Sequence, residues 1–256
     1  MKRLVVILFL LMCGATADAQ TNDQMVRIRG GIVKPFTKSN STTTLIKDFL
    51  IDAYPVTNAE YQEFVEKQTE WRRSKVKRIF ADESYLRYWD GDLGFNAEIS
   101  NSPVVNVSWF AAKAYCECQQ KRLPTADEWD YLSLASETKA DGSNDKNFNQ
   151  YILDWYSRPN PDKLPSVKSS FKNYYGVYGI HGLVWEWVLD FNSAMLTGES
   201  RTNTSSDGDL FCGSGAGDAR DRRDYVAFMR YAFRSSLKAN YTVPNLGFRC
   251  VKDLKP

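Results

Sequence analysis

The chain has 256 residues, of which 43% are hydrophobic and 25% are charged, and its formal net charge is +2 at pH 7. This composition is typical of a soluble globular protein, and the length allows one large domain or two small ones. The near-neutral charge and the lack of a long basic run argue against a protein that binds nucleic acid.

Residues 1–19 have the pattern of an export signal. Lys2 and Arg3 form a positive start, residues 4–12 form a short apolar core, and a small-residue cleavage pattern ends at Ala19. The apolar core is too short to span a bilayer, and no later segment is apolar enough to do so. We therefore expect a periplasmic or secreted protein without a transmembrane anchor.

Cys13 lies inside this signal but does not favour a lipoprotein. A lipoprotein signal needs a small residue before the cysteine, and Met12 is large. We expect cleavage near Ala19 and a mature chain, residues 20–256, that forms one domain.

The first predicted elements are two strands and a helix. Residues 25–33 alternate apolar and polar side chains up to a pair of glycines, which predicts a strand followed by a turn or bulge. Residues 49–56 predict a second strand. Thr57 and Glu60 form a capping box, which predicts a helix over residues 58–67.

The middle of the chain alternates loops and helices. Residues 68–100 lack a clear period and predict a long surface loop held by a few aromatic side chains. Ser108 is placed to cap a helix over residues 109–120, and a second capping box starts a helix that runs from Thr125 to about residue 135. Residues 137–170 are polar and predict mostly loop.

The last third is rich in glycine and aromatic residues. Residues 174–190 combine three glycines, which favour tight turns, with Trp185 and Trp187, which favour a packed core. Residues 230–235 predict an aromatic strand, and residues 245–250 predict a second short strand after a polar loop. The chain is therefore expected to be a single α+β domain with little regular structure for its size.

The mature chain has four cysteines, Cys116, Cys118, Cys212 and Cys250. Export makes disulfides possible, and four cysteines allow three full pairings, between which the residues alone do not decide. On a helix, Cys116 and Cys118 point to different faces, so Cys118 need not share a bridge with its neighbour.

Six motifs in order resemble the formylglycine-generating enzyme family, also called the sulfatase-modifying factor family. They are MVRIRGG (25–31), FLIDAYPVTNAEY (49–61), SPVVNVSWFAAKAYC (102–116), KRLPTADEWDY (121–131), GVYGIHGLVWEW (176–187) and AFRS with NLGFRC (232–235 and 245–250). They cover nearly all of the mature chain. The resemblance implies the α+β, C-type-lectin-like architecture of that family.

The catalytic residues of the family are missing from the matching places. Its oxidases use two cysteines that bind copper and oxidise a substrate thiol, and these places are held here by Asp221 and Val226. Neither side chain is a soft ligand for Cu(I) or a redox group. The related iron-dependent sulfoxide synthases need a histidine-rich site, and this chain has one histidine. We therefore do not expect formylglycine formation.

The resemblance also implies a bridge between Cys116 and Cys250. Cys118 and Cys212 are then left, and two interpretations stay open. In the first, Cys118 and Cys212 are small buried side chains or form a second disulfide. In the second, they are a relocated thiol pair for redox chemistry or Cu(I) binding, with His181 as a further candidate ligand.

A calcium loop is the third implication of the resemblance. The carbonyl groups of Gly182 and Val184 and the carboxylate of Glu186 would hold the ion, which suits a hard cation. The asparagine ligand of the family is replaced by Gly179, which has no side-chain oxygen.

These features predict an exported accessory or binding protein with the family fold and without its catalytic pair, whose partner is another exported protein. The sequences of residues 181–191 and 228–239 also resemble those of NirV-type members found beside copper nitrite reductases. This resemblance implies that the protein assists a periplasmic copper enzyme. The alternative is a thiol-dependent oxidase or copper-binding protein that uses Cys118 and Cys212. The sequence does not determine an oligomeric state.

Overall fold

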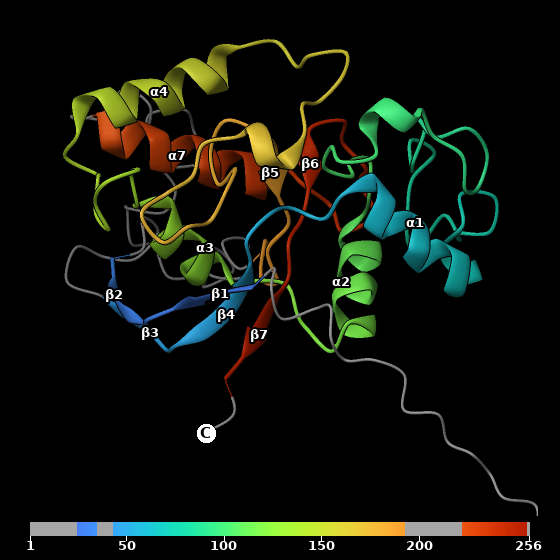
Figure 1. Ribbon diagram of the computed structural model, residues 1–256, viewed down its shortest axis with the longest axis horizontal. Helices are drawn as coiled ribbons and strands as arrows, with labels where there is room; N and C mark the ends of the chain where they lie inside the picture. The colour runs from blue at the N-terminus through green and yellow to red at the C-terminus, as the bar shows by residue number, and fades with distance from the viewer. Residues whose placement is uncertain (1–24, 35–42, 193–221, 255–256) are drawn as a thin grey trace, which may run out of the picture.

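The computed structural model describes residues 25–34, 43–192 and 222–254. Short strands and helices alternate along the chain and are joined by long ordered loops (Figure 1). The α+β class and the modest share of regular structure agree with the sequence-based prediction. The export signal, Cys13, Cys212 and Asp221 lie outside the described residues.

The strands form three small sheets. In the largest, β4 (Phe49–Asp52) lies between β1 (Met25–Ile28) and β7 (Val251–Asp253), and both pairings are antiparallel. The register places Ile51 opposite both Val26 and Val251. The first and last strands of the described chain are therefore joined through one central strand (Figure 1).

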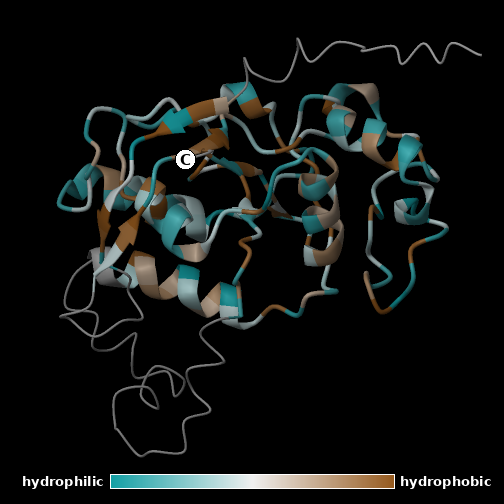
Figure 2. Ribbon diagram, turned by 90° about the horizontal axis from the view of Figure 1, so that it is seen from below, coloured by the Kyte–Doolittle hydropathy of each residue, from teal (hydrophilic) through white to brown (hydrophobic). Residues whose placement is uncertain are grey.

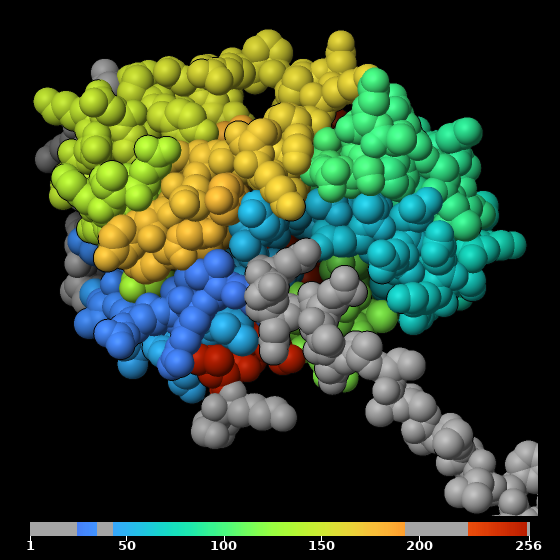
Figure 3. All heavy atoms as spheres, in the orientation of Figure 1, coloured from blue at the N-terminus to red at the C-terminus, as the bar shows by residue number. Residues whose placement is uncertain are grey.

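The two other sheets are ribbons of two strands. An antiparallel ribbon joins β2 (Gly31–Val33) to β3 (Thr44–Ile46), and a parallel one joins β5 (Trp185–Glu186) to β6 (Leu246–Gly247). The parallel pairing aligns Glu186 with Gly247, so that the glycine-rich segment and the C-terminal motif lie side by side. In Figure 3, the chain between α4 and β5 fills the surface between α4 and the first strands.

Three helices begin where their capping residues predict. They are α1 (Asn58–Lys67), α2 (Trp109–Cys118) and α3 (Ala126–Ser133). Thr57 and Thr125 each form a complete capping box with the glutamate three residues later, and Ser108 accepts a hydrogen bond from the amide of Ala111. Local hydrogen bonds satisfy the first amides of these helices, which explains why sequence alone located them.

Two segments differ from the prediction, and they pack against each other. Residues 230–235 are not a strand but the end of helix α7 (Arg222–Ser235), and the expected loop at 137–170 contains helix α4 (Lys146–Ser157). Phe148 and Ile152 of α4 contact Val226 of α7 in one buried cluster. The aromatic residues of 230–235 favour a strand locally and the polar residues of 137–170 favour a loop, but burying one face of each helix against the other stabilises the helical form.

The rest of the core is continuous and rich in aromatic side chains. Tyr85 and Trp89 anchor the long loop after α1, as expected, and Trp187 is fully buried. Gly182 has a φ of 88°, and a Cβ there would lie 1.9 Å from the hydroxyl of Tyr151. This position therefore accepts only glycine, both for its backbone conformation and for its close packing.

A disulfide joins Cys116 of α2 to Cys250, which directly precedes β7. This is the pair that the family resemblance implies, and both cysteines are fully buried. The helices carry both hydrophobic and hydrophilic residues along their length (Figure 2). Among the described residues, no helix has the length and apolar character required to cross a membrane.

Candidate functional site

The place of one expected catalytic thiol is an apolar contact. Val226 lies on α7, is 4% exposed, and packs against Phe148 and Ile152 of α4. An aliphatic side chain in this position supplies neither a copper ligand nor a redox group. The other place, Asp221, lies outside the described residues.

The residues predicted for copper or redox chemistry are not gathered into one described site. Cys118 is a free, exposed thiol at the end of α2, and its sulfur accepts a long contact of 3.9 Å from the side-chain amide of Gln68. His181 is fully buried in the core. No group of three or more histidine, cysteine or acidic side chains in the described part of the chain is arranged to hold a metal ion. Since Cys212 lies outside it, the pair itself stays a prediction.

His181 is held as a neutral side chain. Its Nε2 lies 2.9 Å from the carbonyl oxygen of Ser133, so this nitrogen donates the hydrogen bond. The rings of Trp129, Phe148 and Trp155 surround the imidazole. Burial, together with the positive charge of Arg230, lowers the pKa of His181 to about 3. The imidazole is therefore uncharged at neutral pH, and its Nδ1 has no hydrogen-bond partner among the residues that the structure describes.

Glu186, the predicted calcium ligand, forms a fully buried ion pair with Arg249. The Arg249 Nη2 lies 2.7 Å from Oε1, and its Nε lies 2.9 Å from Oε2 and 3.0 Å from Oε1. The indole nitrogen of Trp129 donates a further bond of 2.9 Å to Oε2. Both oxygens are thus occupied, and an ion in this loop would compete with a guanidinium for the carboxylate.

The calcium loop is therefore poorly matched to this arrangement of Glu186. Gly182 and Val184 lie just before β5, but their carbonyl groups alone are a weak set for a divalent cation. Calcium binding stays a prediction, and titration of the purified protein with calcium chloride measures it directly.

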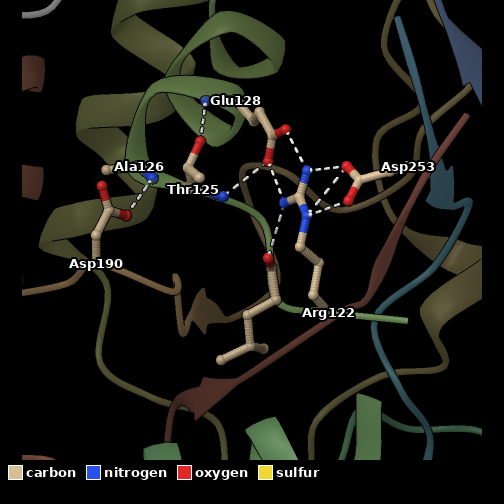
Figure 4. A network of polar contacts seen from close by, with 7 residues as sticks. Arg122, Thr125, Ala126, Glu128, Asp190 and Asp253 are labelled. Carbon is tan, nitrogen blue, oxygen red and sulfur yellow. Dashed lines mark hydrogen bonds and ion pairs between the residues drawn. The ribbon is translucent and has the colours of Figure 1, made fainter. Parts of the chain in front are cut away.

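Arg122 bridges three segments rather than lining a groove (Figure 4). Its guanidinium makes two 2.7 Å hydrogen bonds to the Glu128 carboxylate and one of 2.6 Å to Asp253 of β7. Glu128 also accepts the amide of Thr125, and Asp190 accepts that of Ala126, so the network fixes the start of α3. The Arg122 guanidinium lowers the pKa of Asp253, which keeps this contact charged.

A second arginine cluster was missed by the sequence-based prediction. Arg230 and Arg234 of α7 both face Asp130 of α3, at 3.6 Å and 3.1 Å from the same carboxylate oxygen. The two guanidinium groups also lie 5.8 Å and 4.9 Å from the ring centre of Trp129. The signal was their spacing of four residues, which places both on one face of a helix. Treating the segment as a strand concealed that spacing.

Comparisons with known proteins agree with this fold. The family model of the sulfatase-modifying factor enzyme 1-like domain matches residues 14–254. A formylglycine-generating enzyme of Streptomyces coelicolor is 30% identical over 257 aligned positions, which cover 82% of this chain and 80% of that protein. An inactive C-alpha-formylglycine-generating enzyme 2 of Bos taurus is 29% identical, over 80% of this chain and 77% of that protein.

Among solved structures, variable protein 1 of Treponema denticola matches 90% of this chain and 95% of that chain, with 17% identity and a TM-score of 0.49. The family assignment therefore rests on the family model and on the sequence relatives. On that ground, this chain belongs to the sulfatase-modifying factor enzyme 1-like domain family.

Proposed function

We propose that this protein is a non-catalytic member of the family that acts as an exported accessory or binding protein. The observation that carries the proposal is Val226, a buried aliphatic side chain where the resemblance expects a catalytic thiol. The oxidase chemistry needs two thiolates that bind Cu(I) and carry electrons, and one of the two places holds a packing residue. Relatives that are named inactive formylglycine-generating enzymes in Bos taurus and Mus musculus give the proposal a precedent.

The proposed role is assistance of a partner protein outside the cytoplasm. The export pattern of residues 1–19 supports this location, and the resemblance to NirV-type members supports a periplasmic copper enzyme as the partner. The buried ion pair of Glu186 and Arg249 and the Cys116–Cys250 bridge join distant segments of the chain, which suits a scaffold for binding.

The test is an oxidation assay with a cysteine-containing peptide, Cu(I) and oxygen, followed by mass spectrometry of the peptide. We expect no aldehyde product from this protein, while the Streptomyces coelicolor enzyme serves as the positive control. Mass spectrometry of the exported protein in the same preparation is expected to give Gln20 as its first residue.

Turnover of the peptide would overturn the proposal. The variants Cys118→Ser and Cys212→Ser then identify the thiols responsible, because Cys118 is a free and exposed thiol. Loss of turnover in either variant would support the thiol-dependent oxidase instead.

A further inference from the structure

The contact between α3 and α7 has two positive charges and one negative charge. Arg230 and Arg234 share the single carboxylate of Asp130. Arg230 is 8% exposed, so most of its guanidinium is removed from water. In the described part of the chain, neither arginine forms an ion pair with a second carboxylate. A buried positive charge without a full counter-charge is costly unless an anion compensates it.

Several buried polar atoms on the elements around Arg230 lack a full set of hydrogen bonds. Arg230 Nε, His181 Nδ1, the hydroxyl of Tyr156 and the hydroxyl of Ser235 are the buried side-chain polar atoms that lack a hydrogen bond within the described ranges. Arg230 and His181 both lie against Trp129, and the Arg230 guanidinium also acts on the Tyr156 hydroxyl, where it opposes the rise in pKa that burial causes. Native proteins leave few such atoms, and a group of them calls for a ligand, an ion or water.

Aromatic rings border this polar group and are themselves partly exposed. Trp185 of β5 stacks on Tyr156 of α4 at 4.8 Å and on Phe233 of α7 at 4.4 Å between ring centres. Trp155 lies 5.3 Å from Trp185 on the same side. Figure 1 shows α4 and α7 running side by side next to β5. Partly exposed aromatic side chains thus surround Trp185, and one of them, Phe233, lies on the helix that carries the two arginines.

We propose that the face formed by α3, α4, β5 and α7 binds an anionic oxygen group, carried by a ligand with a planar or apolar body. Arg230 and Arg234 hold the anion, because a guanidinium matches the two oxygens of a carboxylate or phosphate. The partly exposed rings of Tyr156 and Phe233, which stack on Trp185, contact the body of the ligand. The inference rests on the proposed function and deepens it by naming the class of ligand.

This face adjoins the place of the missing thiol. Val226 precedes Arg230 by four residues, so one turn of α7 separates the former catalytic position from the proposed anion site. A binding protein with the family fold would then retain the location of the family's chemistry while using charge and aromatic contact instead of a thiol pair.

The experiment is calorimetric titration of the full mature chain with three probes of one shape: benzoate, phenyl phosphate and benzamide. We expect at least one anion to bind at least tenfold more tightly than neutral benzamide. Benzoate binding more tightly than phenyl phosphate assigns a carboxylate ligand, and the reverse order assigns a phosphate ligand. Equal binding of all three probes, or no binding of any, overturns the proposal.

Two variants separate binding from a structural role. Arg234→Gln is expected to weaken binding of the anion about tenfold or more, because it removes a charge-assisted hydrogen bond. Asp130→Asn is expected to strengthen binding, because the competing carboxylate is gone, and the added anion should raise the melting temperature of this variant. A purely structural cluster would lose stability in Asp130→Asn without any gain in affinity, and that result overturns the proposal.

Arg78→Gln is the matched control, since it removes an exposed arginine from the loop after α1 and should leave the affinity unchanged. If Arg234→Gln fails to fold, Arg234→Lys keeps the charge but loses the planar fork and is expected to bind more weakly than wild type. These titrations need neither oxygen nor a thiol, so their outcome is independent of the oxidation assay. Peptide oxidation with intact anion binding would overturn only the proposed function.

Discussion

At the scale of single residues, burial decides which chemistry a side chain has available. His181 is a plausible metal ligand by residue type, yet the structure surrounds it with three aromatic rings and pairs its Nε2 with a backbone carbonyl. Glu186 is a calcium ligand by motif, yet it neutralises Arg249 in the core. In both cases the motif identifies the residue type, but the neighbouring groups in the fold determine its charge state and which of its atoms remain available.

The pH dependence of stability should report the burial of His181. Its pKa falls from 6.5 to about 3 on folding, so the unfolded chain takes up a proton in mildly acidic solution and the folded chain does not. The stabilisation is therefore complete above pH 6.5 and is lost as the pH falls. Between pH 6.5 and 5, wild type should lose about 1.5 kcal/mol more unfolding free energy than His181→Leu.

Urea unfolding at a series of pH values measures this difference. His181 is the one histidine of the chain, so no other imidazole contributes in this range. Parallel curves for wild type and His181→Leu would show that the folded protein accepts the proton, and would contradict the neutral buried state.

At the scale of elements, local signals located the helices that carry their own caps. The capping boxes at Thr57 and Thr125 and the Ser108 cap lie within four residues of sequence, so sequence alone identified them. Helix α4 has a cap too, since Asp145 accepts the amides of Asn147 and Phe148, but the polar content around it concealed the signal. The end of its partner α7 is predicted as a strand when its aromatic residues are weighed without the spacing of four between Arg230 and Arg234.

Removing one cap should cost stability without changing the fold. In Thr57→Ala, the side-chain oxygen that accepts the amide of Glu60 is lost, and the bond that the Thr57 amide donates to the Glu60 carboxylate loses its geometry. The free energy of unfolding should fall by about 1 kcal/mol, as measured by chemical denaturation. Thr57→Ser keeps the oxygen and should remain within about 0.5 kcal/mol of wild type. Equal losses in both variants would show that packing of the threonine methyl group, not capping, is responsible.

At the scale of the whole molecule, the C-terminal strand β7 is tied to segments that lie far before it in the chain. The Cys116–Cys250 bridge spans 134 residues, and β7 pairs with β4 next to it. Arg122 adds a polar connection from the start of α3 to Asp253 of β7. These contacts join segments that are distant in sequence, which compensates for the small amount of regular structure.

Loss of the Cys116–Cys250 bridge should therefore lower the free energy of unfolding substantially. The double variant Cys116→Ser, Cys250→Ser should lose about 5 kcal/mol of unfolding free energy in the chain-entropy model, because the closed loop is long. Calorimetry of the purified protein checks the value. Cys118→Ser is the matched control and should change stability by about 0.5 kcal/mol or less, since its thiol is exposed. A double variant as stable as wild type would show that the β4–β7 pairing and the hydrogen bonds of Arg122 are sufficient to keep β7 in place.

The sequence by itself determined the family, the α+β class, the capped helices α1, α2 and α3, and the replacement of one expected catalytic thiol by Val226. These features depend on residue identity or on neighbours within a few positions, so no distant contact is needed to infer them. Only the tertiary structure decided that residues 222–235 are helical, that Glu186 is neutralised by Arg249, and that Arg230 and Arg234 meet at Asp130. Each of these outcomes depends on a partner 20 or more residues away in the chain, because side-chain burial and charge pairing are set by which elements pack together.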